Sequence, residues 1–340
     1  MAHILITGAG GYIGSVLTGA ALAAGHRITA IDRFFFGESA LRNLSASERL
    51  RILRNDIRDL APADFEGVDA VFDLAALSND PSGDLDPTLT EAVNHKGRVH
   101  VATCAKEAGV KRYILSSSCS VYGYGDIAEL TEEMSAKPLT TYAKSNLLAE
   151  QDTGSLASAN FCWSAIRNAT VFGLSPRMRF DLVVNLMTLE AVRKGKIFVL
   201  GGGRQWRPLV HVRDVARCFL QILDVPTQLV NGQVFNLGLI NYQVLSIAYL
   251  VRETLPFRIE IEVAPDDPDK RNYNVSFNKI RRDLQFEAQY TVPAGILEIY
   301  EALKLGRTEA TSETSTVGWY RTIVEADRLL KKVRFNDRLL

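Results

Sequence analysis

A glycine-rich turn near the start of the chain has the composition of a phosphate-binding loop. The segment Thr7-Gly8-Ala9-Gly10-Gly11-Tyr12-Ile13-Gly14 follows an apolar run and precedes a helix-forming stretch. Glycines let a backbone turn tightly and approach a pyrophosphate, and a helix N-terminus offers unpaired amides. Asp32 directly follows the next apolar run, where a carboxylate can accept hydrogen bonds from ribose hydroxyls. These residues predict a dinucleotide site, with a plain tight turn as the alternative.

Residues after the following runs define the rest of this predicted site. Asp32 would repel the 2′-phosphate of NADP and favours NAD, although the neighbouring Arg33 could pair with such a phosphate. Asp56 and Ile57 follow the third run, beside the expected adenine, where a solvated loop aspartate is the alternative. Small or apolar side chains at the end of the fourth run would let the cofactor pass close: Leu74, Ala75 and Ala76. We therefore expect NAD as the cofactor.

Six short apolar or β-branched runs must position these residues. Their continuous apolarity suits strands buried on both faces, and helix-forming stretches separate them. This alternation predicts an α/β fold with a doubly wound parallel Rossmann sheet. The expected strands are His3–Thr7, Arg27–Ile31, Arg51–Arg54, Ala70–Leu74, Arg112–Ser116 and Trp163–Arg167, and the expected helices include Tyr12–Ala24, Thr88–Ala108 and Tyr142–Ala159.

The alternation loosens after about residue 170, where proline and glycine punctuate shorter elements. We interpret residues 1–169, with a return segment at about 205–238, as the NAD-binding domain. Residues 170–305 are predicted to form a smaller, discontinuous C-terminal α/β lobe that binds substrate. Residues 306–340 are predicted to form a polar linker and a docking helix. The apolar face of that helix would carry Tyr320, Ile323, Val324, Leu330 and Val333.

Composition argues against several classes of protein. The 340 residues contain 39 Lys plus Arg and 39 Asp plus Glu, so no basic excess is available to neutralise a nucleic-acid backbone. Apolar stretches stop short of the roughly 20 residues that a membrane helix needs. The four cysteines and five histidines are scattered, without the spacing of a metal site. We expect a cytoplasmic protein with no metal, no nucleic-acid partner and no membrane partner.

Further motifs follow in order along about residues 1–305. Asn94 lies in a helix after the Ala75-Ala76 pair, the run Ser116-Ser117-Ser118-Cys119-Ser120-Val121-Tyr122-Gly123 follows, and Tyr142 precedes Ala149-Glu150. As a set, these motifs resemble the extended short-chain dehydrogenase/reductase superfamily, in particular its NAD-dependent nucleotide-sugar epimerases and dehydratases. The resemblance implies that Asn94 and Ser116 contact the cofactor. It also implies a homodimer paired through the helices 88–108 and 142–159.

The resemblance implies catalytic roles for Ser118 and Tyr142. A phenolate beside a nicotinamide ring can take the proton of a sugar hydroxyl as NAD takes the hydride, and Ser118 would hold the oxygen in line. The alternative is that Tyr142 is an aromatic residue of the core.

The chain departs from the family at position 146. Relatives have a lysine four residues after the tyrosine, where it contacts the nicotinamide ribose and lowers the phenol pKa, whereas this chain has Asn146. The amide can bond a ribose hydroxyl but carries no charge. Three explanations are open. The positive charge of the oxidised nicotinamide is enough for Tyr142 to act as the base, another group such as Cys119 or Ser120 is the base, or the chain binds its ligands without catalysing a reaction. On this basis, Asn146→Lys is expected to raise turnover at neutral pH.

The resemblance also assigns residues to the substrate. Arg207 and Arg271 match arginines that hold a diphosphate by charge-assisted hydrogen bonds, and two surface arginines are the alternative. The substrate set is completed by Ser118, Cys119, Ser120, Thr170 and Asn185.

The two residues after Ser118 limit which reactions the chain could catalyse. Sugar dehydratases have Asp and Glu there, and the related decarboxylases have Glu at the second position, whereas this chain has Cys119 and Ser120. Elimination of water would lack its acid and base. We therefore expect an NAD-dependent nucleotide-sugar epimerase, an isomerase of carbohydrate biosynthesis. The alternatives are an NAD(P)H-dependent nucleotide keto-sugar reductase and a catalytically impaired protein that binds NAD or a sugar nucleotide.

Overall fold

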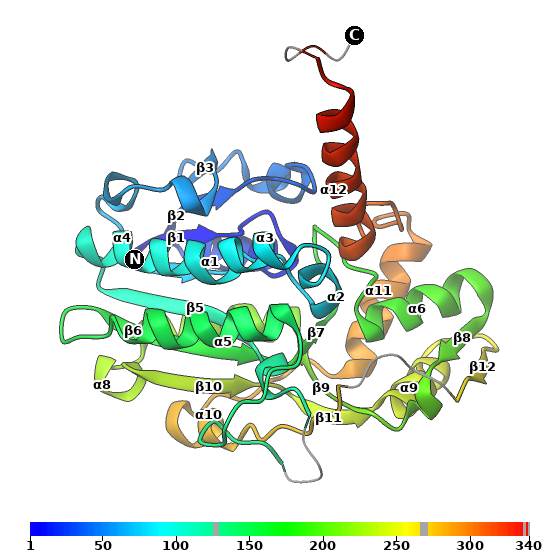
Figure 1. Ribbon diagram of the computed structural model, residues 1–340. Coiled ribbons are helices and arrows are strands. Elements are labelled where there is room, and N and C mark those ends of the chain that lie inside the picture. Colours follow the sequence, from blue (N-terminus) through cyan, green and yellow to red (C-terminus); the bar gives the residue numbers. More distant parts are fainter. Residues whose placement is uncertain (125–128, 266–270, 336–337, 339–340) are drawn as a thin grey trace.

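The fold is built around a parallel sheet. The structure is a computed structural model that describes residues 1–124, 129–265, 271–335 and 338. Seven strands run in the order β10-β6-β5-β4-β1-β2-β3 (Figure 1). They are β1 His3–Thr7, β2 Arg27–Asp32, β3 Leu50–Arg54, β4 Ala70–Asp73, β5 Arg112–Ser118, β6 Cys162–Asn168 and β10 Gln233–Leu237. The strand order reverses between β1 and β4, and ligands of such sheets bind outside the carboxyl ends of the strands at that point.

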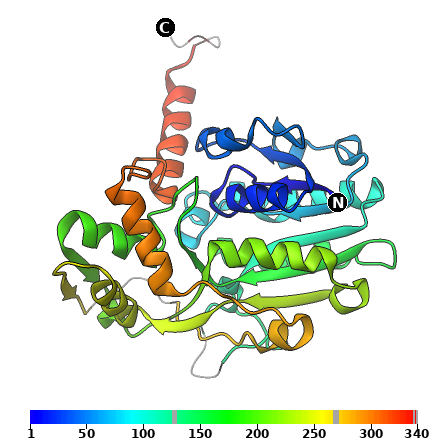
Figure 2. The same ribbon diagram turned by 180° about the vertical axis from the view of Figure 1, so that it is seen from behind.

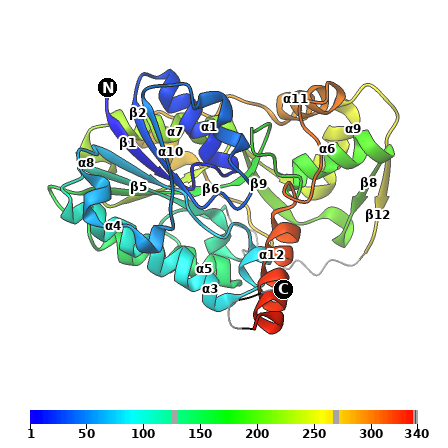
Figure 3. The ribbon, with the colours of Figure 1, turned by 90° about the horizontal axis from the view of Figure 1, so that it is seen from above.

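Helices cover both faces of this sheet, which confirms the predicted doubly wound fold. Figure 3 shows α1 and α7 on one face and α4 and α5 on the other. The helices of this part are α1 Tyr12–Ala23, α2 Asp80–Gly83, α3 Pro87–Glu91, α4 Arg98–Glu107, α5 Thr141–Gly154, α7 Val212–Asp224, α8 Thr227–Val230 and α10 Asn278–Leu284. Apolar side chains of the strands are fully buried between the helices, including Ile4, Leu5, Ile6 and Phe72.

The helix expected over Thr88–Ala108 is interrupted. A π-helical turn, Ala92–Gly97, separates α3 from α4. A π-turn inserts residues into the helical repeat and so changes the face on which the following side chains lie. Arg98, the first residue of α4, is fully buried as a result.

The second part of the structure carries two small sheets. The strands β7 Thr170–Phe172, β9 Trp206–His211 and β11 Ile240–Gln243 form one sheet, and β8 Lys196–Val199 pairs with β12 Glu260–Val263 in the other. Their helices are α6 Val183–Lys194, α9 Val244–Thr254 and α11 Val292–Lys304. These elements share an apolar core that includes Phe172, Ile197, Leu209, Ile247 and Ile296. The domain boundaries expected from the sequence remain a prediction.

The buried residues of the last helix, α12 Thr316–Val333, are Thr316 and Tyr320 in its first turns. Trp319 Nε1 donates a hydrogen bond of 2.6 Å to the carbonyl of Phe35, and the Tyr320 ring packs on Phe35 and Phe36. Figure 2 shows the rest of the helix extending away from the body of the molecule. Val333 was expected on the docking face but is about half exposed. Among the described residues, no neighbouring element packs against it. No helix among those residues is both long and apolar enough to cross a membrane.

Candidate active site

A cavity of about 600 Å³ opens at the carboxyl ends of the central strands. Its lining joins the loops after β1, β2, β4 and β5 to residues of α6, β8 and β9. The cavity therefore lies at the reversal of the sheet, where the fold predicts a ligand.

The glycine-rich turn lies at this cavity with its backbone tightly packed. Gly8 has a φ of +68°, in the left-handed region that favours glycine. A Cβ on Gly14 would lie 2.1 Å from the Gly8 carbonyl oxygen, and one on Gly8 would lie 2.9 Å from the Ala75 nitrogen. The N-cap residue of α1, Gly11, provides no side-chain hydrogen bond to the first amides of the helix. No capping side chain therefore occupies the first N–H groups of α1, which are left for a pyrophosphate.

Asp32 ends β2 beside this turn. Its Oδ2 accepts a hydrogen bond of 2.9 Å from the Gly10 amide, and its Oδ1 accepts one of 2.7 Å from the Phe34 amide. Burial raises the pKa of this carboxyl, and the two amides counteract the effect. Each carboxylate oxygen retains acceptor capacity, so Asp32 can hold both the turn and a ribose.

Arg33 and Asp56 lie next to each other at the same end of the cavity. Arg33 Nη1 is 2.9 Å from Asp56 Oδ2, and Arg58 Nη2 is 2.7 Å from the same oxygen. The hydrogen bond from Arg58 lowers the pKa of Asp56 to about 2. Because Arg33 already has a carboxylate partner, the arrangement favours NAD over NADP. Ile57 and the segment Leu74-Ala75-Ala76 also line the cavity.

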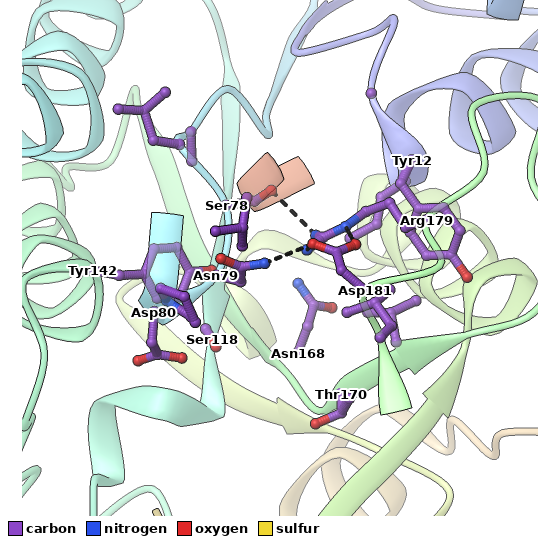
Figure 4. A pocket seen from close by; sticks show the side chains of 18 of the residues that line it. Tyr12, Ser78, Asn79, Asp80, Ser118, Tyr142, Asn168, Thr170, Arg179 and Asp181 are labelled. Carbon is purple, nitrogen blue, oxygen red and sulfur yellow. Dashed lines mark hydrogen bonds and ion pairs between the residues drawn. The ribbon is translucent and has the colours of Figure 1, made fainter. Parts of the chain in front are cut away.

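Ser118 and Tyr142 lie on the β5 side of the point where the strand order reverses, across from the glycine-rich turn after β1. Ser118 ends β5, and Tyr142 lies in the first turn of α5, whose cap is the Thr140 side chain (Figure 4). The phenol is partly buried, lines the cavity together with Ser118, and is near enough to the Ser118 hydroxyl for that group to lower its pKa. Helix α2 can approach because Gly83 has no Cβ; one there would lie 2.8 Å from the Tyr142 Cβ. The geometry places a phenol and a hydroxyl side by side at the cavity wall.

The charges around Tyr142 oppose one another. Burial raises the pKa of the phenol, and the nearby Asp80 carboxylate raises it further. The Arg98 and Arg179 guanidinium groups lower the pKa, as does the Ser118 side chain. The net effect is a pKa above that of a free phenol. Positive charge near Tyr142 acts against this shift, because it favours the phenolate, the form that can accept a proton.

Asn146 lies behind Tyr142, outside the described lining of the cavity. Its side chain is buried, with Oδ1 3.0 Å from Arg98 Nη1 and Nδ2 2.9 Å from the Tyr142 carbonyl oxygen. The Asn146 amide, which we expected to bond a ribose hydroxyl, instead bonds Arg98 and the backbone of α5.

Three other expected site residues also lie outside that lining. The Asn94 side chain bonds both the N–H and the carbonyl of Leu77, at 2.7 and 3.0 Å. Asn185 accepts from the Gly173 amide and donates to the Tyr12 hydroxyl, at 3.0 and 3.1 Å. Cys119 Sγ donates to the Arg167 carbonyl, and burial strongly raises the pKa of the thiol. These side chains hold the framework, and the Cys119 thiol is poorly suited to accept a proton.

The remaining expected substrate residues are brought together in the lining. These are Ser120, Thr170, Arg207 and Arg271. Arg207 Nη1 donates a hydrogen bond of 2.7 Å to the Arg271 carbonyl, and the Arg271 guanidinium pairs with Asp80. The two arginines therefore form one positively charged corner of the cavity.

The structure adds a polar cluster that sequence reasoning missed. Arg179 makes two 3.0 Å hydrogen bonds to Asp181, whose Oδ2 also accepts from Asn79 Nδ2 (Figure 4). Arg179 Nη1 donates to Ser78 Oγ at 3.1 Å. Alternating charged residues at positions 177, 179 and 181 are the signal that could have indicated this cluster.

Two buried oxygen atoms in the lining residues have no hydrogen-bond partner in the described structure. They are Asn168 Oδ1 and Ser120 Oγ. The Asn168 amide is fixed in place because its Nδ2 donates to Ser116 Oγ at 2.9 Å. Since buried polar groups are normally paired, these atoms fit a ligand rich in hydroxyl groups.

Comparison with known proteins gives consistent matches. A model of the NAD dependent epimerase/dehydratase family matches residues 4–238. The chain is 28% identical over 315 residues to UDP-glucose 4-epimerase from Mycolicibacterium smegmatis, which covers 87% of this chain and 97% of that protein. It is 27% identical over 314 residues to UDP-glucuronic acid decarboxylase 1 from Arabidopsis thaliana, which covers 86% of this chain and 68% of that protein. The structure of MoeE5 in complex with UDP-glucose and NAD superposes with a TM-score of 0.78 at 25% identity, over 90% of this chain and 100% of that chain.

Proposed function

The chain belongs to the NAD-dependent epimerase/dehydratase family, and from this premise we propose that it is an NAD-dependent epimerase that inverts one ring carbon of a nucleotide sugar. Its cofactor is NAD. Known proteins similar to it include both epimerases and decarboxylases, so the reaction must be argued from the site. The observation that carries the proposal is the Ser118–Tyr142 pair in the cavity lining, beside which no carboxyl group of the described lining is free to act as an acid.

The carboxylates nearest the pair have arginine partners. Asp80 pairs with Arg271, and Asp181 with Arg179. Burial opposes ionisation of Asp181, yet the pairing with Arg179 outweighs it and leaves the pKa of the carboxyl lowered. Dehydration needs an acid that can give a proton to the leaving hydroxyl, and an ionised, paired carboxylate is unsuited to that step. The lining therefore supports epimerisation over elimination of water.

The chain's own residues move a proton in the proposed mechanism. The turn at Gly8 and the Asp32 carboxylate would hold NAD, which would supply a reversible hydride acceptor there. Tyr142 accepts the proton of the sugar hydroxyl, and Ser118 holds that oxygen in line. After the keto sugar turns in the cavity, Tyr142 returns the proton to the same oxygen. The atoms balance, because substrate and product differ only in configuration.

We assign the rest of the cavity to substrate binding. Arg207 and Arg271 would hold the diphosphate through charge-assisted hydrogen bonds, and Thr170 lies in the same lining. The unpartnered Asn168 Oδ1 and Ser120 Oγ would accept hydrogen bonds from sugar hydroxyls. We further propose a cytoplasmic homodimer that pairs through α4 and α5.

One alternative to the epimerase is a nucleotide keto-sugar reductase. A second is a protein that binds NAD or a sugar nucleotide without catalysis, which is favoured by the uncharged Asn146. The purified protein would be denatured gently and the released cofactor identified by mass spectrometry. Absorbance of the reduced cofactor would then be followed with nucleotide sugars and with a 4-keto nucleotide sugar. An epimerase shows retained NAD, a new epimer and no net redox change. Stoichiometric loss of reduced cofactor would instead identify the reductase, and binding without any product would identify the non-catalytic protein.

Helix α12 is expected to strengthen NAD binding. Tyr320 lines the cavity and packs on the loop that follows Asp32. Tyr320→Ala is expected to raise the Kd for NAD about tenfold, a change of about 1.4 kcal/mol, as measured by titration calorimetry. Leu329→Ala, on the exposed end of the same helix, is the matched control and should bind NAD as the unaltered protein does. Equal affinity in both variants would show that α12 does not contribute to the cofactor site.

A further inference from the structure

Arg98 is a fully buried cation beneath the floor of the cavity. Its side chain is 0% exposed, as is that of Asp73. Arg98 Nε lies 3.3 Å from Asp73 Oδ2, and Nη2 donates to the carbonyls of Asp73 and Ser116 at 2.9 and 2.6 Å. The guanidinium therefore lies at the carboxyl ends of β4 and β5, next to the strand that carries Ser118. These contacts offset the cost of removing the charge from water.

The remaining edge of this guanidinium faces α5. Arg98 Nη1 donates to Asn146 Oδ1 at 3.0 Å, and Asn146 Nδ2 donates to the Tyr142 carbonyl at 2.9 Å. Residues four apart lie on one face of a helix, so the contact holds the guanidinium under the face that carries Tyr142. Asp73 lies along the Nε and Nη2 edge, away from the edge that meets α5.

We propose that Arg98 supplies, from the neighbouring helix α4, the positive charge that favours ionisation of Tyr142, and that Asn146 is the positioning residue that holds the guanidinium there. The proposal rests on the proposed function, in which Tyr142 is the base. It explains how the site works with an uncharged residue one turn after the tyrosine. The positive charge comes from α4 instead of from the position four residues after the tyrosine on α5.

The charges that face Tyr142 come from three elements. Asp80 of α2 raises the pKa of the phenol, whereas Arg98 of α4 and Arg179, before α6, lower it. Arg179 uses Nε, Nη1 and Nη2 on Asp181 and Ser78. Of the two cations, Arg98 is the one with a hydrogen bond into α5. The ionisable groups packed on Arg98 itself are Asp73 and Tyr113, whose hydroxyl donates to Asp73.

This arrangement reverses the expectation for Asn146→Lys. An ammonium group at that position would meet the Arg98 guanidinium in place of its acceptor, and two like charges would be buried together. The single substitution is therefore expected to destabilise the protein without raising turnover. Replacing both residues, as Arg98→Gln with Asn146→Lys, returns one cation to the site and is expected to restore function.

The test is a direct titration of Tyr142. Tyrosine labelled with ¹³C at Cζ would be followed by NMR with and without NAD, and the Tyr142 resonance assigned by its loss in Tyr142→Phe. The pKa of Tyr142 is expected to rise in Arg98→Gln, and to remain near its original value in Arg98→Lys and in the double variant. Arg112→Gln is the control, because Arg112 begins β5, at the end of the strand opposite Ser118, and bonds carbonyls at the C-terminal end of α7 there.

The pH dependence of turnover provides the second measurement. In Arg98→Gln, kcat at neutral pH is expected to fall at least tenfold and to recover as the pH rises, because each unit of pKa is a tenfold change in the ionised fraction. A purely structural role would lower kcat equally at every pH. An unchanged Tyr142 titration in folded Arg98→Gln would overturn the proposal. If that variant does not fold, the double variant decides: an unshifted Tyr142 titration supports the proposal, and a raised pKa overturns it.

The two proposals fail separately. The NMR titration needs no substrate, so an Arg98-dependent pKa in a protein that never forms an epimer would refute the proposed function alone. Epimerase activity with a Tyr142 titration independent of Arg98 would refute only the assignment of Arg98.

Discussion

Tyr142→Phe is expected to lower turnover by about 100- to 10,000-fold, the range that general acid–base groups contribute. The substitution removes the oxygen that accepts the proton but keeps the partly buried ring, and the close approach of α2 is to the Tyr142 backbone and Cβ, which do not change. NAD affinity and thermal stability should therefore change little. Turnover would be measured under saturating substrate, together with the NAD content of the purified variant.

Tyr249→Phe is the matched control for this loss of one hydroxyl. Tyr249 lies on α9 with 41% of its surface exposed, and its variant should turn over as the unaltered protein does. Undiminished turnover in Tyr142→Phe would show that another group is the base. Of the groups considered in the sequence, Cys119 is a poor candidate because its thiol is buried and bonded to a carbonyl.

Gly14→Ala is expected to disrupt the phosphate-binding turn. The added methyl group would lie 2.1 Å from the Gly8 carbonyl oxygen and 2.8 Å from the Ala9 Cα, so the turn or the start of α1 must shift. Such overpacking costs about 1–3 kcal/mol of stability, and displaced amides would lower NAD affinity by a larger factor. Thermal unfolding and calorimetric titration with NAD measure the two effects.

Gly19→Ala, in the same helix, separates steric conflict from the general effect of alanine. A Cβ at Gly19 would meet only the Leu44 side chain, at 3.8 Å, which is an ordinary contact. Alanine in a helix interior is favoured over glycine by roughly 0.5–1 kcal/mol, so this variant should be slightly more stable and bind NAD normally. A Gly14→Ala protein as stable and as tightly binding as Gly19→Ala would contradict the tight packing of the turn.

The position of the glycine-rich turn and of Asp32 could be predicted from the local sequence. The turn at Gly8 and the strand that ends at Asp32 follow from glycine spacing and apolar runs, because backbone geometry near a strand end is decided by residues close in the chain. The structure places both at the cavity. Ser118 and Tyr142 came from a resemblance, and both line the same cavity in the structure.

The parts that depend on packing between distant segments could not be predicted. The π-turn before α4 turns Arg98 inward, and no periodicity in residues 88–108 indicates it. Asn146 was expected to face a ribose because its partner, Arg98, lies 48 positions away. Likewise, the predicted face of α12 gives no indication that the buried residues of this helix, Thr316 and Tyr320, lie at its N-terminal end.

The central claim is that a hydride leaves one carbon of a nucleotide sugar and returns to the same carbon from the other side. The most direct measurement uses nucleotide sugars carrying deuterium on the ring carbons that bear hydroxyl groups, with the product examined by NMR and mass spectrometry. We expect an epimer that retains deuterium on the inverted carbon, without any change in mass or in total reduced cofactor. A product that has lost water or carbon dioxide, or one whose deuterium has exchanged with solvent, would contradict it.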